Sequence, residues 1–372
     1  MASRLAVRAT ANAVLAALLI AALAVTAPLI RARADTTDAA PIPIRVVVVT
    51  TFEIGKDAGD TPGELQNWVE YYPLPQIIPF PQGYHHLRYN PDQQVLAIET
   101  GEGAVHGAAS IMALGMDPRF DLTKAYWVVA AIAGVDPNWA SVGSAAWAKY
   151  VVDGDLAYEI DARQIPSGWS TGYVPLGRSA PYQLPVPPAN SLNGEQVFTL
   201  DPGFVDWAVN LTSSITLPDD ATLQKVRSGY PDYPRALKPP FVLQGDDLAA
   251  STFWVGDKLN AWAENWITYW TQGKGRFVMT AEEDAGILQS LTFLSHVGRV
   301  DRRRVLVLRT ASDYSVQPEG KTPAQFLASE NNGGLSGFIE SLNAAFAVGS
   351  RVVRELSGHW DRYADHIPSA PH

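Results

Sequence analysis

Three continuous apolar runs, rich in β-branched residues, constrain the fold of this chain more than any other feature of its sequence. They span residues 45–52, 125–133 and 304–309, and a shorter run spans residues 94–99. An apolar run without polar alternation is typical of a strand that is covered on both faces, as in the interior of an α/β sheet. Helical patterns occur between and after these runs, and they span residues 103–115, 252–270, 282–296 and 335–356. Strands that alternate with helices predict the α/β fold class.

Residues 165–240 differ from the rest because they contain twelve prolines. This density disfavours regular structure and predicts a long insertion that meanders over the surface, with one short helix at residues 205–212. Contact with a substrate and a solvent-facing excursion without function both fit the pattern. The chain shows no internal repeat and no second core, so we expect a single domain at residues 44–360, followed by a tail at 361–372.

The N-terminal segment has the pattern of a secretory signal peptide. Arg4 and Arg8 precede an apolar run, and the small-residue motif at 32–34 follows it. This order predicts a signal peptide at 1–34, a linker at 35–43 and an exported protein, periplasmic or extracellular. An uncleaved N-terminal membrane anchor is the alternative. After residue 35 no apolar stretch reaches the length of a membrane-spanning helix.

Charge and cysteine content exclude several classes of function. The chain has 28 basic and 38 acidic residues, a formal net charge of −10. Removal of residues 1–34, which hold four Arg and no acid, leaves 24 basic residues and a charge of −14. This charge argues against nucleic acid as a partner. The absence of Cys excludes disulfides, thiol nucleophiles and Cys-ligated metals. We expect no cofactor.

Three further patterns are better explained by structure than by chemistry. Ser170 lies in a G-x-S-x-G match, but prolines on both sides remove the strand and helix that a nucleophile elbow needs. His85 and His86 lack accompanying ligands, so we expect a surface loop and no metal. The tryptophans at 262, 266 and 270 share one side of a helix and are expected to pack in the core.

Two acidic segments are stronger candidates for a site. Residues 282–284 (Glu-Glu-Asp) begin a predicted helix, and residues 309–313 come at the end of a predicted strand. Ligand-binding groups of an α/β sheet gather at the carboxyl ends of its strands. The turn at residues 101–107 also follows a strand and begins a helix, a setting for ligand binding at a helix N-terminus. As a dinucleotide fingerprint its glycine spacing is weak.

These segments, in this order, resemble the purine nucleoside permease family, which is related to the nucleoside phosphorylase and nucleosidase superfamily. The resemblance covers residues 42 to 358. The segments that carry it are Gly101-Glu102-Gly103, Ala133-Gly134, Gly245-Asp246, Glu283 and Ser312-Asp313, together with residues 47–55, 132–137 and 309–315. It implies a single nucleoside phosphorylase-like domain with a central mixed β-sheet flanked by helices.

The resemblance also implies roles for individual residues. Asp313, next to Ser312, would hydrogen-bond or protonate a purine at N7, and Glu283, beside Glu282, would bind ribose hydroxyls. Gly101 and Gly103 would approach the ribose or anion subsite, and Gly134 would belong to the same nucleoside site. Glu53 would stand where nucleosidases keep a carboxylate for the attacking water.

Two functions follow from the resemblance. The first is binding of purine nucleosides and a part in their uptake or metabolism, with a separate membrane transporter as a candidate partner. The second is that of a nucleosidase that cleaves the N-ribosidic bond. Phosphorolysis is disfavoured because Lys56 is the only cation near Gly55 and the turn at Gly101 holds no Arg. A homo-oligomer is a further candidate assembly, and the sequence leaves the number of subunits open.

Overall fold

A computed structural model describes residues 40–189 and 195–370. The described residues from Ile42 onward form one compact unit, which agrees with the single domain that the sequence predicts. The predicted signal peptide at 1–34, like most of the predicted linker at 35–43, lies outside the described residues.

The centre of the fold is a sheet whose main strands are the predicted apolar runs. Strand β7 (Tyr126–Val135) lies between β2 (Val46–Thr50) and β16 (Val305–Tyr314) and is parallel to both, and β5 (Val95–Glu99) pairs in parallel with β2. Every residue of β2, β5 and β16 is buried. Burial on both faces explains why these strands read as continuous apolar runs.

Further strands make the sheet mixed, as predicted. Beyond β5 the sheet continues with the antiparallel strands β4 (Leu87–Asn90) and β3 (Gln76–Ile78). On the far side of β7 it continues with β15 (Phe277–Ala281), β14 (Asp246–Ala249), β9 (Tyr150–Asp153) and β12 (Val197–Thr199), while β8 (Ala145–Trp147) and β13 (Val242–Gln244) join through β16. Two separate strand pairs are β1 (Ile42–Pro43) with β6 (Phe120–Asp121) and β10 (Ala157–Glu159) with β11 (Tyr173–Pro175).

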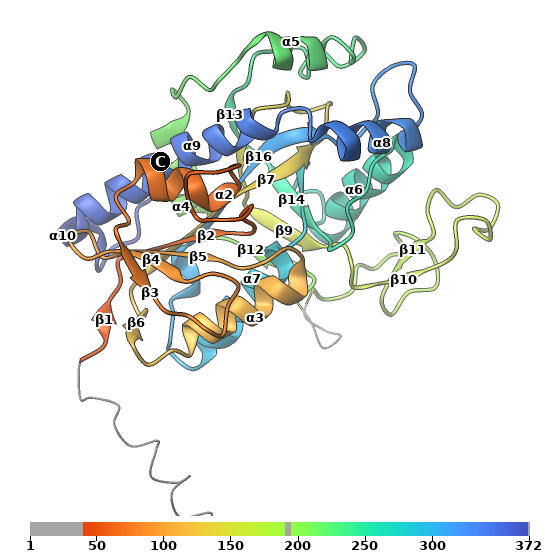
Figure 1. Ribbon diagram of the computed structural model, residues 1–372. Helices are drawn as coiled ribbons and strands as arrows, with labels where there is room; N and C mark the ends of the chain where they lie inside the picture. Colours follow the sequence, from red (N-terminus) through yellow and green to blue (C-terminus); the bar gives the residue numbers. More distant parts are fainter. Residues whose placement is uncertain (1–39, 190–194, 371–372) are drawn as a thin grey trace, which may run out of the picture. The chain divides into compact units, whose positions relative to one another are not determined.

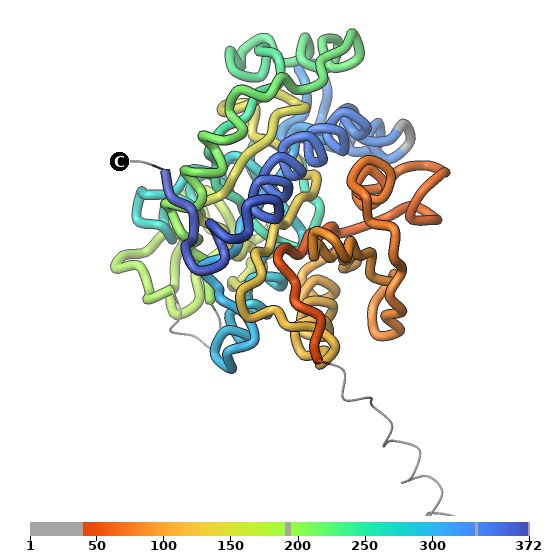
Figure 2. Tube along the Cα trace, turned by 90° about the vertical axis from the view of Figure 1, so that its left-hand side faces the viewer, coloured from red at the N-terminus to blue at the C-terminus, as the bar shows by residue number. Residues whose placement is uncertain are grey.

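Helices cover both faces of the sheet. Figure 1 shows α2 (Glu64–Tyr71), α4 (Pro202–Thr212) and α9 (Phe338–Gly358) above β2 and β5, and α3 (Ala104–Gly115) and α7 (Asp284–His296) below them. Helix α9, dark blue in Figure 2, packs on β7 and β16. The remaining helices are α5 (Ala221–Arg227), α6 (Asp257–Trp270), α8 (Pro323–Gly333), α10 (Trp360–Tyr363) and a 3-10 turn at Arg302–Arg304.

The tryptophans of α6 pack in the core, as predicted. Trp262, Trp266 and Trp270 are buried in one apolar cluster with Val152 and Leu248 of the sheet. Aromatic side chains bury a large apolar surface, so this stripe attaches α6 to β9 and β14 of the sheet.

The proline-rich segment holds more regular structure than its composition predicts. Strand β12 adds to the central sheet through β9, and α4 begins directly after it. Pro202 occupies the first turn of α4, where a missing N–H is tolerated, and Asp201 accepts a hydrogen bond from the backbone of Phe204 at 3.0 Å. The predicted helix at 205–212 therefore begins three residues earlier, and its residues Phe204 and Val205 are fully buried.

A short helix follows at the predicted C-terminal boundary of the domain. Residues 361–363, assigned to a tail, belong to α10, and Tyr363 is buried. Arg304 donates hydrogen bonds to the backbone oxygens of Tyr363 and Ala364 at 3.1 Å and 2.8 Å, which attaches this end to the sheet.

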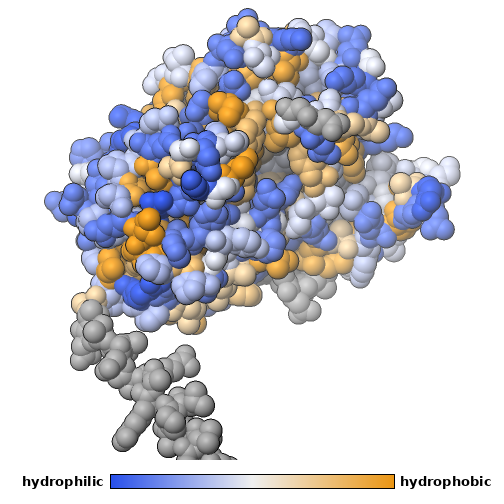
Figure 3. All heavy atoms as spheres, in the orientation of Figure 1, coloured by the Kyte–Doolittle hydropathy of each residue, from blue (hydrophilic) through white to orange (hydrophobic). Residues whose placement is uncertain are grey.

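Within the part of the chain that the structure describes, no helix is long and apolar enough to span a membrane. The face in Figure 3 mixes hydrophilic residues with scattered hydrophobic patches.

Candidate functional site

A cavity of about 290 Å³ opens at the carboxyl ends of the central strands. It is lined by the ends of β2, β7, β15 and β16, by the first residue of α2, and by the segment that leads into α9. Its residues are Thr51, Phe52, Ile54, Glu64, Glu102, Ile132, Ala133, Gly134, Phe253, Thr280, Ala281, Glu282, Glu283, Arg309, Ser312, Asp313, Leu335 and Phe338. Five of the predicted site residues thus lie together: Glu282, Glu283, Ser312, Asp313 and Gly134.

A β-bulge in β16 brings Ser312 and Asp313 to the same cavity. The pairing of β16 with β7 shifts register between Ala311 and Asp313, so that Asp313 lies opposite Gly134. Successive side chains of a regular strand point to opposite faces, whereas a bulge redirects one of them. The Ser312 hydroxyl lies 2.8 Å from Asp313 Oδ1 and 3.1 Å from the backbone oxygen of Ala133. Its position therefore fixes the orientation of the Asp313 carboxyl group.

Burial changes the acidity of Asp313. The residue is 2% exposed. Burial raises the pKa of Asp313 to about 7, and the hydrogen bond from Ser312 opposes the shift. The negative charges of Glu330 and Glu282 raise it further. A carboxyl group with this pKa can hold a proton at neutral pH and give it to a ligand.

Glu283 is held on both of its carboxylate oxygens. It is the N-cap residue of α7, which begins at Asp284, two residues later than predicted. Its Oε1 accepts a hydrogen bond from the backbone N–H of Gly103 at 3.0 Å, and its Oε2 accepts one from Arg309 Nη2 at 2.8 Å. The two contacts leave the carboxylate fixed in the cavity wall. Beside it, burial and the charges of Glu283 and Glu102 raise the pKa of Glu282 to about 7.

Glu64 is a site residue that the sequence analysis missed. It is the first residue of α2 and is 3% exposed. Its carboxylate accepts hydrogen bonds from the backbone N–H groups of Thr51 at 2.6 Å and Ile132 at 2.7 Å. Burial raises the pKa of Glu64 to about 8, although Arg309 and these amides oppose the shift. The sequence signal for Glu64 is weak, because it consists only of a carboxylate that begins a helix after the first buried strand.

Arg309 belongs to the predicted segment 309–313, but the sequence analysis assigned it no role, although its signal was plainer than that of Glu64. It is a charged residue inside an apolar strand, where a charge is almost always paired. Its guanidinium is fully buried and contacts Glu283, Asp284 and the backbone oxygen of Ile132. Burial opposes its charge, yet the two carboxylates hold the pKa of Arg309 well above its usual range.

Glu53 does not line the cavity. Its carboxylate accepts hydrogen bonds from the backbone N–H groups of Gly63 and Gln66, at 2.5 Å and 2.6 Å, and so caps the N-terminus of α2. The carboxylate from this connection that does line the cavity is Glu64, eleven residues later. The reason is local: the free N–H groups at the start of a helix attract the nearer carboxylate.

The predicted glycines have different roles. Gly134 lines the cavity, and a Cβ there would lie 3.0 Å from Thr280 Oγ1 and 3.3 Å from Asp313 Oδ2. Gly101 and Gly103 do not line it. Gly103 adopts a φ of +87° and donates its N–H to Glu283, so its contribution is to hold that carboxylate.

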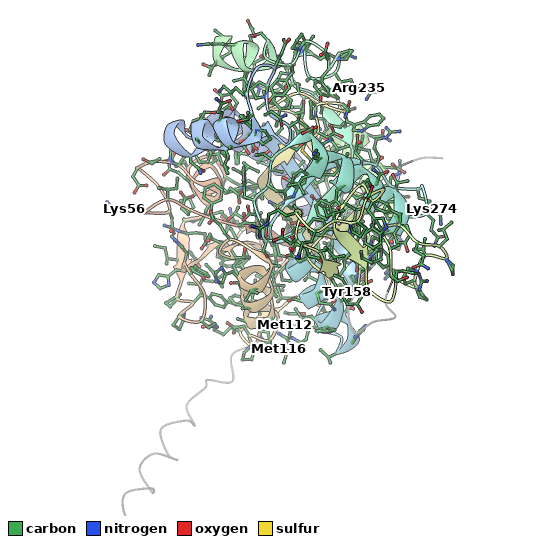
Figure 4. All side chains as sticks on the ribbon, turned by 90° about the vertical axis from the view of Figure 1, so that its right-hand side faces the viewer. Lys56, Met112, Met116, Tyr158, Arg235 and Lys274 are labelled. Carbon is green, nitrogen blue, oxygen red and sulfur yellow. The ribbon has the colours of Figure 1, made fainter. Side chains whose placement is uncertain are left out.

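The walls of the cavity combine acid groups with apolar surface. The rings of Phe52 and Phe338 lie 6.0 Å apart, and Ile132 and Leu335 add to the apolar part. Five carboxyl groups face the cavity with a single guanidinium, and that guanidinium is already bound to carboxylates. Lys56 is exposed at the edge of the molecule (Figure 4). The arrangement suits a flat, neutral ligand with hydroxyl groups and opposes a phosphate.

Comparison with known proteins finds a match between this chain and one protein family. The sequence model described as "Purine nucleoside permease (NUP)" matches residues 43–368. A protein of Candida albicans named "Purine nucleoside permease" is 31% identical over 283 residues, which are 75% of this chain and 68% of that protein. A protein of Schizosaccharomyces pombe named a probable purine nucleoside permease is 28% identical over 284 residues, 74% of this chain and 80% of that protein.

Two solved structures are also similar to the fold. Futalosine hydrolase of Helicobacter pylori aligns with a TM-score of 0.49 and 12% identity over 84% of this chain and 98% of that chain. A 5'-methylthioadenosine/S-adenosylhomocysteine nucleosidase from S. pneumoniae aligns with a TM-score of 0.49 and 16% identity over 84% of this chain and 99% of that chain.

Proposed function

The chain belongs to the purine nucleoside permease family, and from this premise we propose that its cavity binds a purine nucleoside. One observation carries the proposal: Asp313, with a pKa of about 7, and Glu283, held in place on both oxygens, line the same cavity. A purine nucleoside presents a ring nitrogen that accepts a proton and sugar hydroxyls that donate hydrogen bonds. These are the partners that the two groups can serve.

Each part of the ligand has a counterpart in the wall. Asp313, oriented by Ser312, would hydrogen-bond the purine at N7, and Glu283 would accept hydrogen bonds from the ribose hydroxyls. The apolar side chains of Phe52 and Phe338 would cover the faces of the ligand that make no hydrogen bonds. Glu282 lies next to Glu283 and would bound the sugar side of the cavity.

We further propose that this binding takes place outside the cytoplasm and contributes to nucleoside uptake. The support is the signal-peptide pattern of residues 1–34. A captured nucleoside, or its base, would pass to a separate membrane transporter. N-terminal sequencing of the protein recovered from the extracytoplasmic fraction tests the location. A new N-terminus near residue 35 supports export by cleavage, and an intact N-terminus in the membrane fraction supports the anchor.

A second candidate function is hydrolysis of the N-ribosidic bond, and Glu64 is the observation that favours it. Its carboxylate lines the same cavity as Asp313 and can accept a proton. Water would attack the anomeric carbon while Glu64 takes its proton. The carbon–nitrogen bond would break with its electron pair going to the purine, and Asp313 would deliver a proton to N7. The products are free base and ribose.

One experiment decides between the two functions. The purified protein, lacking residues 1–34, is incubated with inosine and with adenosine, with and without phosphate, and free base and bound nucleoside are measured. Binding without base release supports the binding function alone. Base release without phosphate, reduced at least about 100-fold in Asp313→Asn, supports hydrolysis. Release that requires phosphate contradicts the inference from the acidic cavity, and neither binding nor release contradicts both functions.

A further inference from the structure

Two fully buried carboxyl groups behind the cavity have no part in the proposed chemistry. Asp284, the first residue of α7, is 0% exposed, and Asp247 of β14 is 1% exposed. Neither lines the cavity. Burial of a carboxyl group is unfavourable unless a partner compensates for the lost hydration, so each of these groups needs a structural reason.

The reason for Asp284 is Arg309. Arg309 Nε lies 3.0 Å from Asp284 Oδ2, and Nη2 lies 2.6 Å from Asp284 Oδ1, which is a two-point contact between a planar guanidinium and a carboxylate. Such contacts fix the orientation of the guanidinium as well as its position. The same Nη2 donates to Glu283 Oε2 at 2.8 Å, while Nη1 donates to the backbone oxygen of Ile132 at 2.9 Å. Asp284 and the backbone of Ile132 therefore hold Arg309 in place, and its guanidinium presents one donor to Glu283 at the cavity wall.

Charge balance distinguishes Asp247 from Asp284. Among the described residues no hydrogen-bond donor reaches either carboxyl oxygen of Asp247. Burial raises the pKa of Asp247 well above its ordinary value, and the nearby Asp284 carboxylate raises it further. Burial thus disfavours a negative charge on Asp247, whereas the carboxylates of Asp284 and Glu283 pair directly with the positive charge of Arg309.

We propose that Asp284 is a positioning residue for ribose recognition: through Arg309 it fixes the carboxylate of Glu283 that binds the ribose hydroxyls. This inference rests on the proposed nucleoside site. Glu283 is then held between two fixed donors, Arg309 on one oxygen and the N–H of Gly103 on the other. Glu283 itself lines the cavity, where its remaining lone pairs would accept the hydroxyl hydrogens. Without Asp284, Arg309 loses its two-point contact and Glu283 loses its fixed direction.

The test compares two ligands that differ by one hydroxyl group, inosine and 2'-deoxyinosine. The dissociation constants are measured by calorimetry for the wild-type chain and for Asp284→Asn, which has nearly the same shape without the charge. We expect the wild type to prefer inosine by at least about tenfold, as for a hydrogen bond to a charged group, and Asp284→Asn to prefer it by less than about threefold. If the role of Asp284 were purely structural, Asp284→Asn would weaken the binding of both ligands by the same factor. The ratio of their dissociation constants would then stay unchanged.

Asp136→Asn is the matched control. Asp136 is a fully buried carboxyl group that follows β7, and its Oδ1 accepts a hydrogen bond from the backbone of Asn138 at 2.9 Å. It does not line the cavity, so this variant is expected to keep the wild-type ratio. If Asp284→Asn does not fold, as judged by circular dichroism, Asp284→Glu replaces it. This variant keeps the charge but displaces the carboxylate by one methylene, and a reduced ratio is again expected.

The outcomes separate this inference from the function on which it rests. If the wild type binds neither ligand, the proposed nucleoside site is wrong and the inference falls with it. If the wild type prefers inosine and the Asp284 variant keeps the same ratio, the nucleoside site stands and the inference is overturned. If the ratio falls in the Asp284 variant and holds in Asp136→Asn, the inference is supported.

Discussion

At the scale of the residue, the site depends on carboxyl groups whose pKa values burial has raised into the neutral range. The pKa of Asp313 is raised to about 7 and that of Glu64 to about 8, in each case chiefly by loss of solvent. Ordinary solvated carboxyl groups titrate about three pH units lower. The same residue types can therefore exchange protons here that they could not exchange at the surface.

If the chain hydrolyses nucleosides, this acidity predicts a bell-shaped pH profile. Asp313 must carry a proton, so activity falls as the pH rises above about 7, and Glu64 must have lost its proton, so activity falls as the pH drops below about 8. We expect kcat/KM for inosine to peak between these values. Base release is measured from pH 5.5 to 9.5. Base release that keeps rising as the pH falls to 5.5 would show that ordinary carboxyl groups act in place of these two.

A pair of variants separates Glu64 from Glu53. Glu64→Gln removes a carboxylate from the cavity, and we expect at least about a 100-fold loss of base release. Glu53→Gln removes a charged cap of α2, and we expect a loss of about 1 kcal/mol in the free energy of unfolding and less than about a threefold loss of rate. Rates and urea unfolding are measured on both. A larger loss of rate in Glu53→Gln than in Glu64→Gln would indicate that Glu53 is the catalytic carboxylate.

At the scale of the element, the site depends on how closely α3 and α7 approach. Helix α7 begins directly after Glu283, and α3 begins directly after Gly103, whose N–H binds Glu283. The helices can meet there because α7 has a glycine at 286: a Cβ at this position would lie 1.9 Å from the backbone oxygen of Ala104. Helix packing and ligand contact thus share the same few residues.

Gly286→Ala is expected to disturb the packing of α3 on α7 and the ligand contact at the same time. The added methyl group meets backbone and cannot be relieved by a side-chain rotation, so we expect a loss of about 1–3 kcal/mol in the free energy of unfolding. Displacement of α3 should also weaken nucleoside binding, because Gly103 moves with it. Gly358→Ala at the end of α9 is the control, since a Cβ there meets nothing within 4 Å. Urea unfolding and calorimetry check both variants; equal stability of the two would refute the packing argument.

At the scale of the whole molecule, the raised pKa values of buried carboxyl groups connect the site to stability. Burial raises the pKa of several carboxyl groups to about 6, 7 or 8: those of Glu64, Glu99, Asp136, Asp153, Glu282 and Asp313. In the unfolded chain these groups regain ordinary values near 4. Between pH 4.5 and 8 the folded state therefore binds more protons than the unfolded state.

Because stability follows the difference in bound protons, the free energy of unfolding should decrease as the pH rises through this window. We expect Tm to fall by about 5 °C or more between pH 5.5 and pH 8. Thermal unfolding by circular dichroism at constant ionic strength measures the slope. A double variant, Glu64→Gln with Asp313→Asn, should show a shallower slope, and a Tm that rises over the same range would mean that these groups are not buried as described.

Local patterns in the sequence were enough to predict the fold class and part of the site. Continuous apolar runs indicate strands buried on both faces whatever their partners, and Asp313 and Glu283 stand in motifs next to a strand end or a helix start. In the proline-rich segment local pattern predicted α4 to within three residues of its start but missed β12, which forms because it pairs with β9 of the sheet.

Only the tertiary structure decided how the site residues combine. Glu53 and Glu64 are eleven residues apart on one connection, and their roles differ because one meets the free N–H groups of α2 and the other meets the backbone of β7. The contact of Gly103 with Glu283 joins residues 180 positions apart. Periodicity and spacing report on neighbours along the chain, whereas burial, charge pairing and pKa depend on groups that come together only when the sheet and its helices close around the cavity.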